Sequence, residues 1–399
     1  MKSDVIKSFA DNPSATTMDE IISLAKNSIT DEQIAELATI LAESGDTLNF
    51  ENNILAADIP STGGLGSLST ILTPLVLTEL DFIVPKLGIA GRPAGGIDVL
   101  FQIPNYKIHF SRKEVLACLE MSKYCHFLVG NNYAPLDSVL FKYRSNVKAK
   151  AVPALVIASI LSKKIAAGLK VTGLDVRVSS FGNFGITWNE AIQNARQFIT
   201  VANMINIKAV CYLNNFNVLQ QPYIGRGESL LAVHNIFNDV NEPWLTNHLY
   251  RCIEMAIELD VKGNLVSNIP LKVLKKNFEY NLIAQGSSMD NFYKKVEEVE
   301  KEHIHSIVSQ TSGFLKINLF LLRELLVNYQ KIQESPTDLF PDPCGIIFKK
   351  KSQDYVQKGE IILTYRIIEK FNESFLLNLS RVIEVEARYE QDFEFQIIK

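Results

Sequence analysis

Two glycine-rich turns, each beside an expected strand or helix, constrain the fold of this chain more than any other feature. The first turn is residues 61–66, STGGLG, which precede an expected helix at residues 67–80. The second is residues 91–96, GRPAGG, which follow an expected strand at residues 83–89. Strand, glycine turn and helix in succession are typical of a loop that holds a phosphate or a sugar on an α/β sheet.

The rest of the chain continues this alternation. Thr30, with Gln33 at the capping-box position, predicts the start of a helix near the N-terminus. Further expected elements are helices at residues 114–127, 136–168 and 190–204, strands at 171–178 and 209–213, and short C-terminal strands at 342–349 and 359–365. The sequence therefore predicts an α/β fold with a mixed or parallel sheet, followed by a small β-rich C-terminal module.

Composition narrows the class of protein. Of 399 residues, 47% are hydrophobic and 21% charged, and the net charge is -4, so electrostatics favour neither nucleic acid nor a membrane as partner. Five scattered Cys and six His form no metal-binding or catalytic spacing, so we expect buried free thiols and neither a metal nor a cofactor. No basic segment followed by an apolar one begins the chain, which leads us to expect a cytoplasmic protein.

The segment around residues 152–167 carries the strongest chemical signal. It is apolar on nearly every side, so we expect a buried helix. Ser159 and Lys163 lie four residues apart on one face of that helix. A buried ammonium needs a cleft, a partner or a helix end, and Lys163 also lies close to the helix terminus at Gly168, where a cation is favourable for purely structural reasons.

A resemblance to a known family favours a functional role for Lys163 over the purely structural one. Residues 158–168, ASILSKKIAAG, resemble the ASILSKKLAAG signature of the pyrimidine-nucleoside (thymidine) phosphorylases. Residues 134–144, APLDSVLFKYR, are similar to that family's APADKxLYALR, and STGGLG is similar to its STGGVG. Further matches follow in family order from about residue 18 to 365, and an ordered series is far more specific than one glycine motif.

The resemblance implies a small helical domain joined to a larger α/β domain, with the active site between them. It places residues 1–47 and 137–167 in the helical domain, 54–136 and 168–335 in the α/β domain, and 336–399 in the β-rich C-terminal module. It also implies a homodimer held by the helical domains.

The base-binding half of the implied site is retained. Family members hold the pyrimidine with an Arg, a Ser and a Lys, and Arg144, Ser159 and Lys163 match these in identity and spacing. The departing base gathers negative charge in the transition state, so Arg144 and Lys163 are also the expected catalytic groups.

The phosphate-binding half is largely rewritten. Ile59 stands where the family has a Lys that contacts phosphate, and Ala90 and Ile97 replace a Ser and a Thr. Four expected contacts to phosphate, another anion or the sugar remain: Ser61, Gly63, Gly64 and Arg92. We expect inorganic phosphate to bind poorly, unless Ser67, Ser69 or Lys86 takes over, although Lys86 is more simply a surface residue.

Three functions stay open on the sequence. The first is glycosyl (pentosyl) transfer on a pyrimidine nucleoside or nucleotide, with phosphate replaced or bound differently. The second is a non-catalytic pyrimidine-binding or regulatory homologue, and the third is a phosphorylase of low efficiency. A pyrimidine base or nucleoside is the expected ligand under all three.

Overall fold

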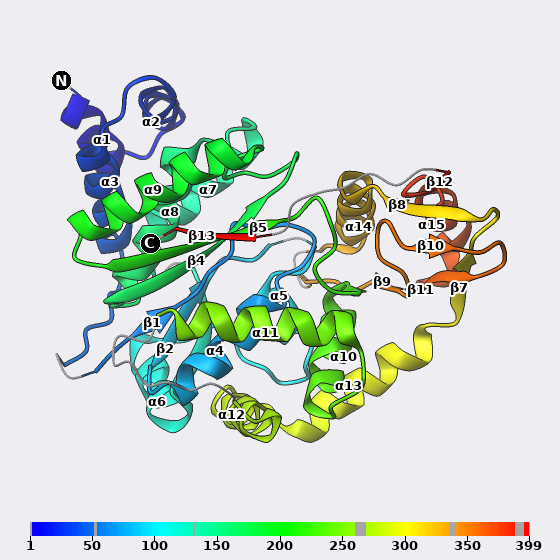
Figure 1. The fold of residues 1–399 in the computed structure, drawn as a ribbon. Coiled ribbons are helices and arrows are strands. Elements are labelled where there is room, and N and C mark those ends of the chain that lie inside the picture. The colour runs from blue at the N-terminus through cyan, green and yellow to red at the C-terminus, as the bar shows by residue number, and fades with distance from the viewer. Residues whose placement is uncertain are drawn as a thin grey trace.

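The computed structural model describes residues 2–51, 54–91, 93–130, 132–259, 269–335, 338, 340–387 and 395–398. Parallel and antiparallel strands are both present, with helices packed on each side of the main sheet (Figure 1). The predicted α/β class with a mixed sheet is confirmed.

The main sheet runs in the order β1-β4-β5-β13. Its strands are β1 (Ala57–Asp58), β4 (Val171–Val178), β5 (Lys208–Asn215) and β13 (Phe395–Ile398). The first three are parallel, and β13 pairs antiparallel with β5, so the end of the chain returns to this sheet. A bridge between Ala56 and Ile83 continues it into the parallel pair β2 (Val84–Gly88) and β3 (Tyr124–Leu128). All eight residues of β4 are buried, as predicted for residues 171–178.

One face of the main sheet is covered by the N-terminal helices. Leu174 and Val176 of β4 point to this face, in one apolar core with Leu161 of α8. The helices of this part are α1 (Lys2–Asp11), α2 (Ala15–Asn27), α3 (Asp31–Glu43), α7 (Pro135–Asn146), α8 (Pro153–Ala166) and α9 (Trp188–Met204). Thr30 caps α3 and forms the capping box with Gln33, as predicted.

The opposite face carries the other core. Val171 and Tyr212 alternate with their neighbours and belong instead to this second core, together with Leu72 and Leu75 of α4. The helices here are α4 (Ser69–Glu79), α5 (Gly96–Leu100), α6 (Arg112–Ser122), α10 (Arg226–Phe237), α11 (Pro243–Ile257), α12 (Leu271–Ala284) and α13 (Met289–Glu302). α4 is buried over Ser69–Thr78 because it lies inside the protein rather than at its surface.

The C-terminal part contains two further sheets around a third core (Figure 1). One has the order β6-β9-β11-β7 and the other β10-β8-β12. Their elements are β6 (Tyr223–Ile224), β7 (His305–Val308), β8 (Gly313–Ile317), β9 (Cys344–Phe348), β10 (Tyr355–Val356), β11 (Ile361–Ile367) and β12 (Ile383–Glu386), with α14 (Leu319–Gln333), the short 3-10 turn η1 (Glu369–Phe371) and α15 (Asn372–Leu379). The division into domains stays a prediction, but strands on both sides of residue 336 share these sheets.

Two predicted elements are wrong in part. Residues 136–168 were expected to be helical throughout, but they form α7 and α8 with a non-helical connection over residues 147–152. The helix expected at residues 114–127 ends at Ser122, and Tyr124–Leu128 form β3 instead. Lys123 adopts a left-handed backbone conformation, with φ of 59°, which ends the helix. The β3 backbone then pairs in parallel with β2, a long-range contact that local periodicity does not encode.

Candidate functional site

A cavity of about 1060 Å³ lies where α7 and α8 face the carboxyl end of β1 and the strands beside it. Six of the seven residues predicted for the site line it: Ser61, Gly63, Gly64, Arg144, Ser159 and Lys163. The seventh, Arg92, lies outside the described residues. Ligands of open α/β sheets bind beyond the carboxyl ends of the strands, so this position suits a binding site.

Lys163 is held by two partners inside the protein. Its Nζ donates to Asp137 Oδ2 at 2.5 Å and to Ser159 Oγ at 2.9 Å, and also to the Ser159 carbonyl oxygen. Burial lowers the pKa of Lys163, while the Asp137 carboxylate raises it. Asp137 is only 1% exposed, so its charge is there to balance that of Lys163. The sequence interpretation gave no role to Asp137, because 26 residues separate the two.

Arg144 is tied to the backbone next to the same helix. Its guanidinium donates to the carbonyl oxygens of Ala149 (3.3 Å), Lys150 (2.9 Å) and Leu155 (2.9 Å). These bonds fix the segment that connects α7 to α8. Burial lowers the pKa of Arg144 to about 10, against the opposing effect of Asp137. A guanidinium has five N–H groups, so donors remain for a ligand in the cavity.

The first glycine turn is held by a residue that the sequence interpretation did not single out. Gly63 and Gly64 have φ of 102° and 131°, a region that glycine adopts without strain. Arg177 of β4 donates to the Gly63 carbonyl oxygen at 2.9 Å, and also to that of Gly66. Its guanidinium lies 4.5 Å from the centre of the Phe216 ring. Arg177 therefore fixes the shape of the turn.

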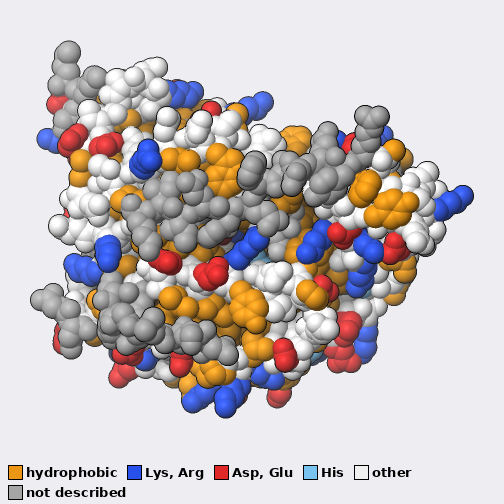
Figure 2. Space-filling model, viewed as in Figure 1, with side chains coloured by type: hydrophobic (Ala, Val, Ile, Leu, Met, Phe, Trp, Pro, Cys, Tyr) orange, Lys and Arg blue, Asp and Glu red, His pale blue; other side chains and the backbone are white. Residues whose placement is uncertain are grey.

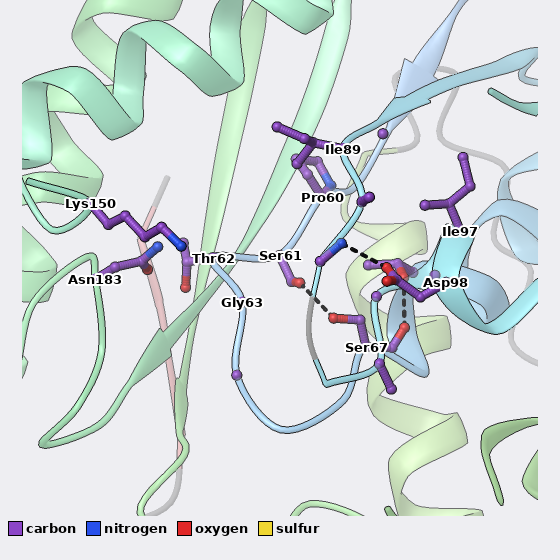
Figure 3. Close-up of a pocket in the computed structure, with 18 of the residues that line it drawn as sticks. Pro60, Ser61, Thr62, Gly63, Ser67, Ile89, Ile97, Asp98, Lys150 and Asn183 are labelled. Carbon is purple, nitrogen blue, oxygen red and sulfur yellow. Dashed lines mark hydrogen bonds between the residues drawn. The ribbon is translucent and has the colours of Figure 1, made fainter. Parts of the chain in front are cut away.

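The close-up of the cavity shows how this turn meets the other wall (Figure 3). Ser61 Oγ and Ser67 Oγ lie 3.2 Å apart at one side of the turn. Lys150, from the connection before α8, extends toward Thr62 and Asn183 from the opposite side. Side chains of the helical part and of the sheet thus approach one another across the cavity.

The three apolar residues on the phosphate side differ in whether their side chains reach the cavity. Ala90 and Ile97 line the cavity, whereas Ile59 is 1% exposed and belongs to the apolar core. A Cβ on Gly173 would lie 2.9 Å from Ile59 Cγ1, so the Ile59 side chain packs against β4.

Lys86, interpreted from the sequence as a surface residue, is in fact buried, with 4% exposure. It donates to Asp58, which also accepts from Lys164 of α8. Burial opposes ionisation of Asp58, but Lys164 and Lys86 outweigh it and lower the pKa of this carboxyl to about 2. All three residues line the cavity.

His126 of β3 also lines the cavity, although no His was predicted to take part. Tyr124 Oη lies 3.0 Å from His126 Nδ1. Burial and, after it, the charge of Lys86 hold the pKa of His126 well below its usual range. The ring is therefore neutral near pH 7 and adds no charge to the cavity wall.

The charge of the cavity differs from that of the molecule. Its lining includes ten Lys or Arg and four Asp or Glu, although the whole chain carries -4. On the outer face shown in Figure 2, by contrast, side chains of both signs are interspersed. An excess of cations in a partly enclosed space favours an anionic ligand.

Neither a candidate metal site nor a membrane-spanning helix is found among the described residues. No group of three or more His, Cys, Asp or Glu within them could hold a metal ion. Over the same ranges, every helix is too short or too polar to cross a bilayer.

Comparisons with known proteins find relatives over most of the chain. The chain is 26% identical to the AMP phosphorylase of Methanococcus maripaludis over 356 residues, which cover 85% of this chain and 67% of that protein. It is 26% identical to the pyrimidine-nucleoside phosphorylase of Geobacillus stearothermophilus over 361 residues, covering 84% and 80%. No family model matches the chain.

A solved structure adds support at the level of the fold. The anthranilate phosphoribosyltransferase of Thermus thermophilus superposes with a TM-score of 0.51 and 14% identity, over 74% of this chain and 93% of that one. Relatives named AMP phosphorylase and pyrimidine-nucleoside phosphorylase thus match most of the chain at about a quarter identity, which supports its resemblance to that family as a divergent member. The relatives support an enzyme and pentosyl transfer in general.

Proposed function

We propose that this protein transfers a pentosyl group by cleaving the N-glycosidic bond of a pyrimidine nucleoside or nucleotide, with an altered phosphate site. One observation carries the proposal. Arg144, Ser159 and Lys163, matched to the family by identity and spacing, line the same cavity as the Ser61–Gly64 turn. Base-binding groups and a turn able to hold an anion or a sugar thus meet around one space.

The chemistry requires charge stabilisation on the base side. As the bond between C1′ and the base nitrogen breaks, its electron pair leaves with the base. An acceptor oxygen forms the new bond to C1′, and the proton that the acceptor loses neutralises the base. Lys163 and Arg144 would stabilise the negative charge on the leaving base, and donors of this kind act more strongly in a buried site than in water.

The identity of the group that accepts the pentosyl group is what the test below must determine. Ile97 and Ala90 offer no hydrogen-bond donor from their side chains, and Ile59 does not reach the cavity. Phosphate, another oxyanion or water could accept the pentosyl group. The AMP phosphorylase relative is named for a nucleotide substrate, so nucleoside 5′-monophosphates belong in the test together with nucleosides.

The test is product analysis on a panel of uridine, thymidine, cytidine, UMP and AMP, each with and without inorganic phosphate. We expect free pyrimidine base to appear and purine base to be released more slowly. Ser159→Ala and Lys163→Met should slow release at least about tenfold, because each removes a hydrogen-bond donor from the base side. Base release that is equal in both variants and in the unaltered protein would refute the site assignment.

A second function, pyrimidine binding without catalysis, is favoured by a separate observation. The three donors of Lys163 are already used by Asp137 and Ser159, and three donors of Arg144 by backbone carbonyls. A ligand must therefore compete with bonds inside the protein. Tight binding of uracil or uridine in calorimetry, without base release under any condition of the panel, would establish this second function instead.

A further inference from the structure

A lysine from the connection between α7 and α8 reaches across the cavity. Lys150 lines the cavity, and its side chain extends from the helical side toward Thr62 and Asn183 on the side of the sheet (Figure 3). Its ammonium lies 5.5 Å from the centre of the Phe141 ring. A contact between an exposed lysine and a ring is weak, so a ligand in the cavity can replace it. We call Lys150, Thr62 and Asn183 the Lys150 cluster.

The backbone at Lys150 is fixed by the base side of the site. Arg144 Nη2 donates to the Lys150 carbonyl oxygen at 2.9 Å, and Arg144 Nε donates to that of Ala149 at 3.3 Å. The residue proposed to bind the base thus also holds the connection from which the Lys150 side chain extends. A substrate held by Arg144 through its base therefore lies beside Lys150, with its sugar between the base and the first glycine turn.

Thr62 and Ser61 are neighbours in the chain but face different parts of the cavity (Figure 3). Ser61 Oγ lies 3.2 Å from Ser67 Oγ, whereas Thr62 Oγ1 accepts from the backbone N–H of Arg177 at 3.0 Å. A hydroxyl that accepts such a bond keeps its own proton to donate. Thr62 is 7% exposed and lines the cavity, so the wall near Lys150 carries a buried hydroxyl donor that is separate from Ser61.

The third member of the cluster comes from the loop after β4. Asn183 is half-buried, lines the cavity and lies near the end of the Lys150 side chain (Figure 3). Its amide can present two N–H donors. The cluster therefore combines one cation with a hydroxyl and an amide, each from a different segment of the chain. A phosphate group, with its negative charge and several acceptor oxygens, suits such a set of donors.

We propose that the Lys150 cluster binds the 5′-phosphate of the substrate and makes this protein selective for nucleoside 5′-monophosphates over nucleosides. This inference rests on the proposed function, because it chooses between the two substrate classes that the proposal contains. The phosphate bound in this way takes no part in the bond changes at C1′. It adds binding energy that a nucleoside lacks, and Lys150 is the residue that determines this specificity.

The direct test is titration calorimetry of uridine and of UMP into the full chain, at constant ionic strength set with chloride. We expect UMP to bind at least about tenfold more tightly than uridine. Lys150→Met should abolish this preference and leave the affinity for uridine unchanged within about twofold, whereas Lys150→Arg, which keeps the charge, should retain part of the preference. Because Lys150 is exposed, its replacement should not disturb the fold.

Lys148→Met is the matched control. Lys148 is an exposed cation of the same connection, but it does not line the cavity. Its replacement changes the net charge by the same amount and should leave the preference for UMP intact. A preference that falls equally in Lys148→Met and Lys150→Met would reflect the general charge of this region, and would overturn the assignment of the phosphate to Lys150.

Inorganic phosphate and the nucleotide are two sources of the same chemical group, and a third titration separates them. The same proteins are titrated with inorganic phosphate alone. If Lys150→Met weakens its binding as strongly as that of UMP, the cluster is a site for free phosphate, and the assignment to the substrate is overturned. Equal affinity for UMP and uridine in the unaltered chain, or no saturable binding of UMP, would overturn it as well.

Failure of this inference can be told from failure of the proposed function. A preference for UMP that depends on Lys150, in a protein that releases no base from any substrate of the panel, would support the cluster and refute the reaction. Base release at equal rates from uridine and UMP, both in the unaltered chain and in Lys150→Met, would support the reaction and refute the cluster.

Discussion

Asp137→Asn is the change that most sharply tests how the base side is built. Asp137 is 1% exposed and places Oδ2 at 2.5 Å from Lys163 Nζ. Its Oδ1 has no hydrogen-bond partner among the described residues, so the carboxylate is committed mainly to this pair. Asparagine keeps the shape and removes the charge. Lys163 then has only neutral acceptors around it, and the Asp137 charge that raises its pKa against the effect of burial is lost.

The size of the effect follows from the ammonium that remains. Removing one partner of a buried ion pair costs about 3–5 kcal/mol. Lys163 can escape part of that cost by losing its proton, which costs about 1.4 kcal/mol for each pH unit below an unfolded pKa near 10.4. The free energy of deprotonating Lys163 is therefore about 5 kcal/mol at pH 7 and about 2 kcal/mol at pH 9, and it sets the upper limit of the loss of stability. We expect a loss of about 3–4 kcal/mol in the free energy of unfolding at pH 7, shrinking to about 2 kcal/mol or less at pH 9.

The sign of this pH dependence is fixed by the protons bound in each state. With Lys163 neutral in the folded variant, the unfolded chain binds one more proton below pH 10, so the stability of the variant rises with pH relative to the unaltered protein. Urea unfolding at pH 7 and pH 9 measures both values. A loss below about 1 kcal/mol that does not change with pH would refute the reasoning.

Two controls accompany the measurement. Asp81→Asn removes the carboxylate of an exposed pair with Lys123 and should cost less than about 1 kcal/mol. The double variant Asp137→Asn with Lys163→Met removes the unpaired ammonium as well. It should be more stable than Asp137→Asn alone at pH 7, because the buried charge is gone.

Three further outcomes are expected. The Asp58 carboxylate, with a pKa of about 2, stabilises the fold above about pH 4 and loses that contribution as the pH falls toward 2, so Asp58→Asn should lower stability at pH 6 more than at pH 3 in urea unfolding. Arg144→Ala should cost about 2–4 kcal/mol of stability besides weakening pyrimidine binding, because two buried carbonyl groups and a partly buried one lose their donor; unchanged urea unfolding would contradict this. We also propose a homodimer held by the helical part, and sedimentation at micromolar concentration showing a monomer would contradict it.

The sequence alone predicted which residues of α8 share one face, because that geometry is encoded locally. The four-residue spacing of Ser159 and Lys163 predicts one face of a helix, and the structure has them hydrogen-bonded on α8. The capping box at Thr30 and the buried strand β4 also follow from patterns within a few residues. Short-range geometry of this kind depends on the backbone period alone, so a single sequence suffices to predict it.

Contacts between distant segments were decided only by the tertiary structure. Residues 124–127 were expected to be helical, but pairing with β2 makes them part of a strand. Lys86 looked like a surface residue, yet the fold buries it against a carboxylate 28 residues away, and Asp137 meets Lys163 across 26 residues. A local pattern shows which side chains share a face, whereas their charge partners depend on how strands and helices pack. The shared face of Ser159 and Lys163 was therefore predictable from the sequence, whereas the buried charges that surround them were not.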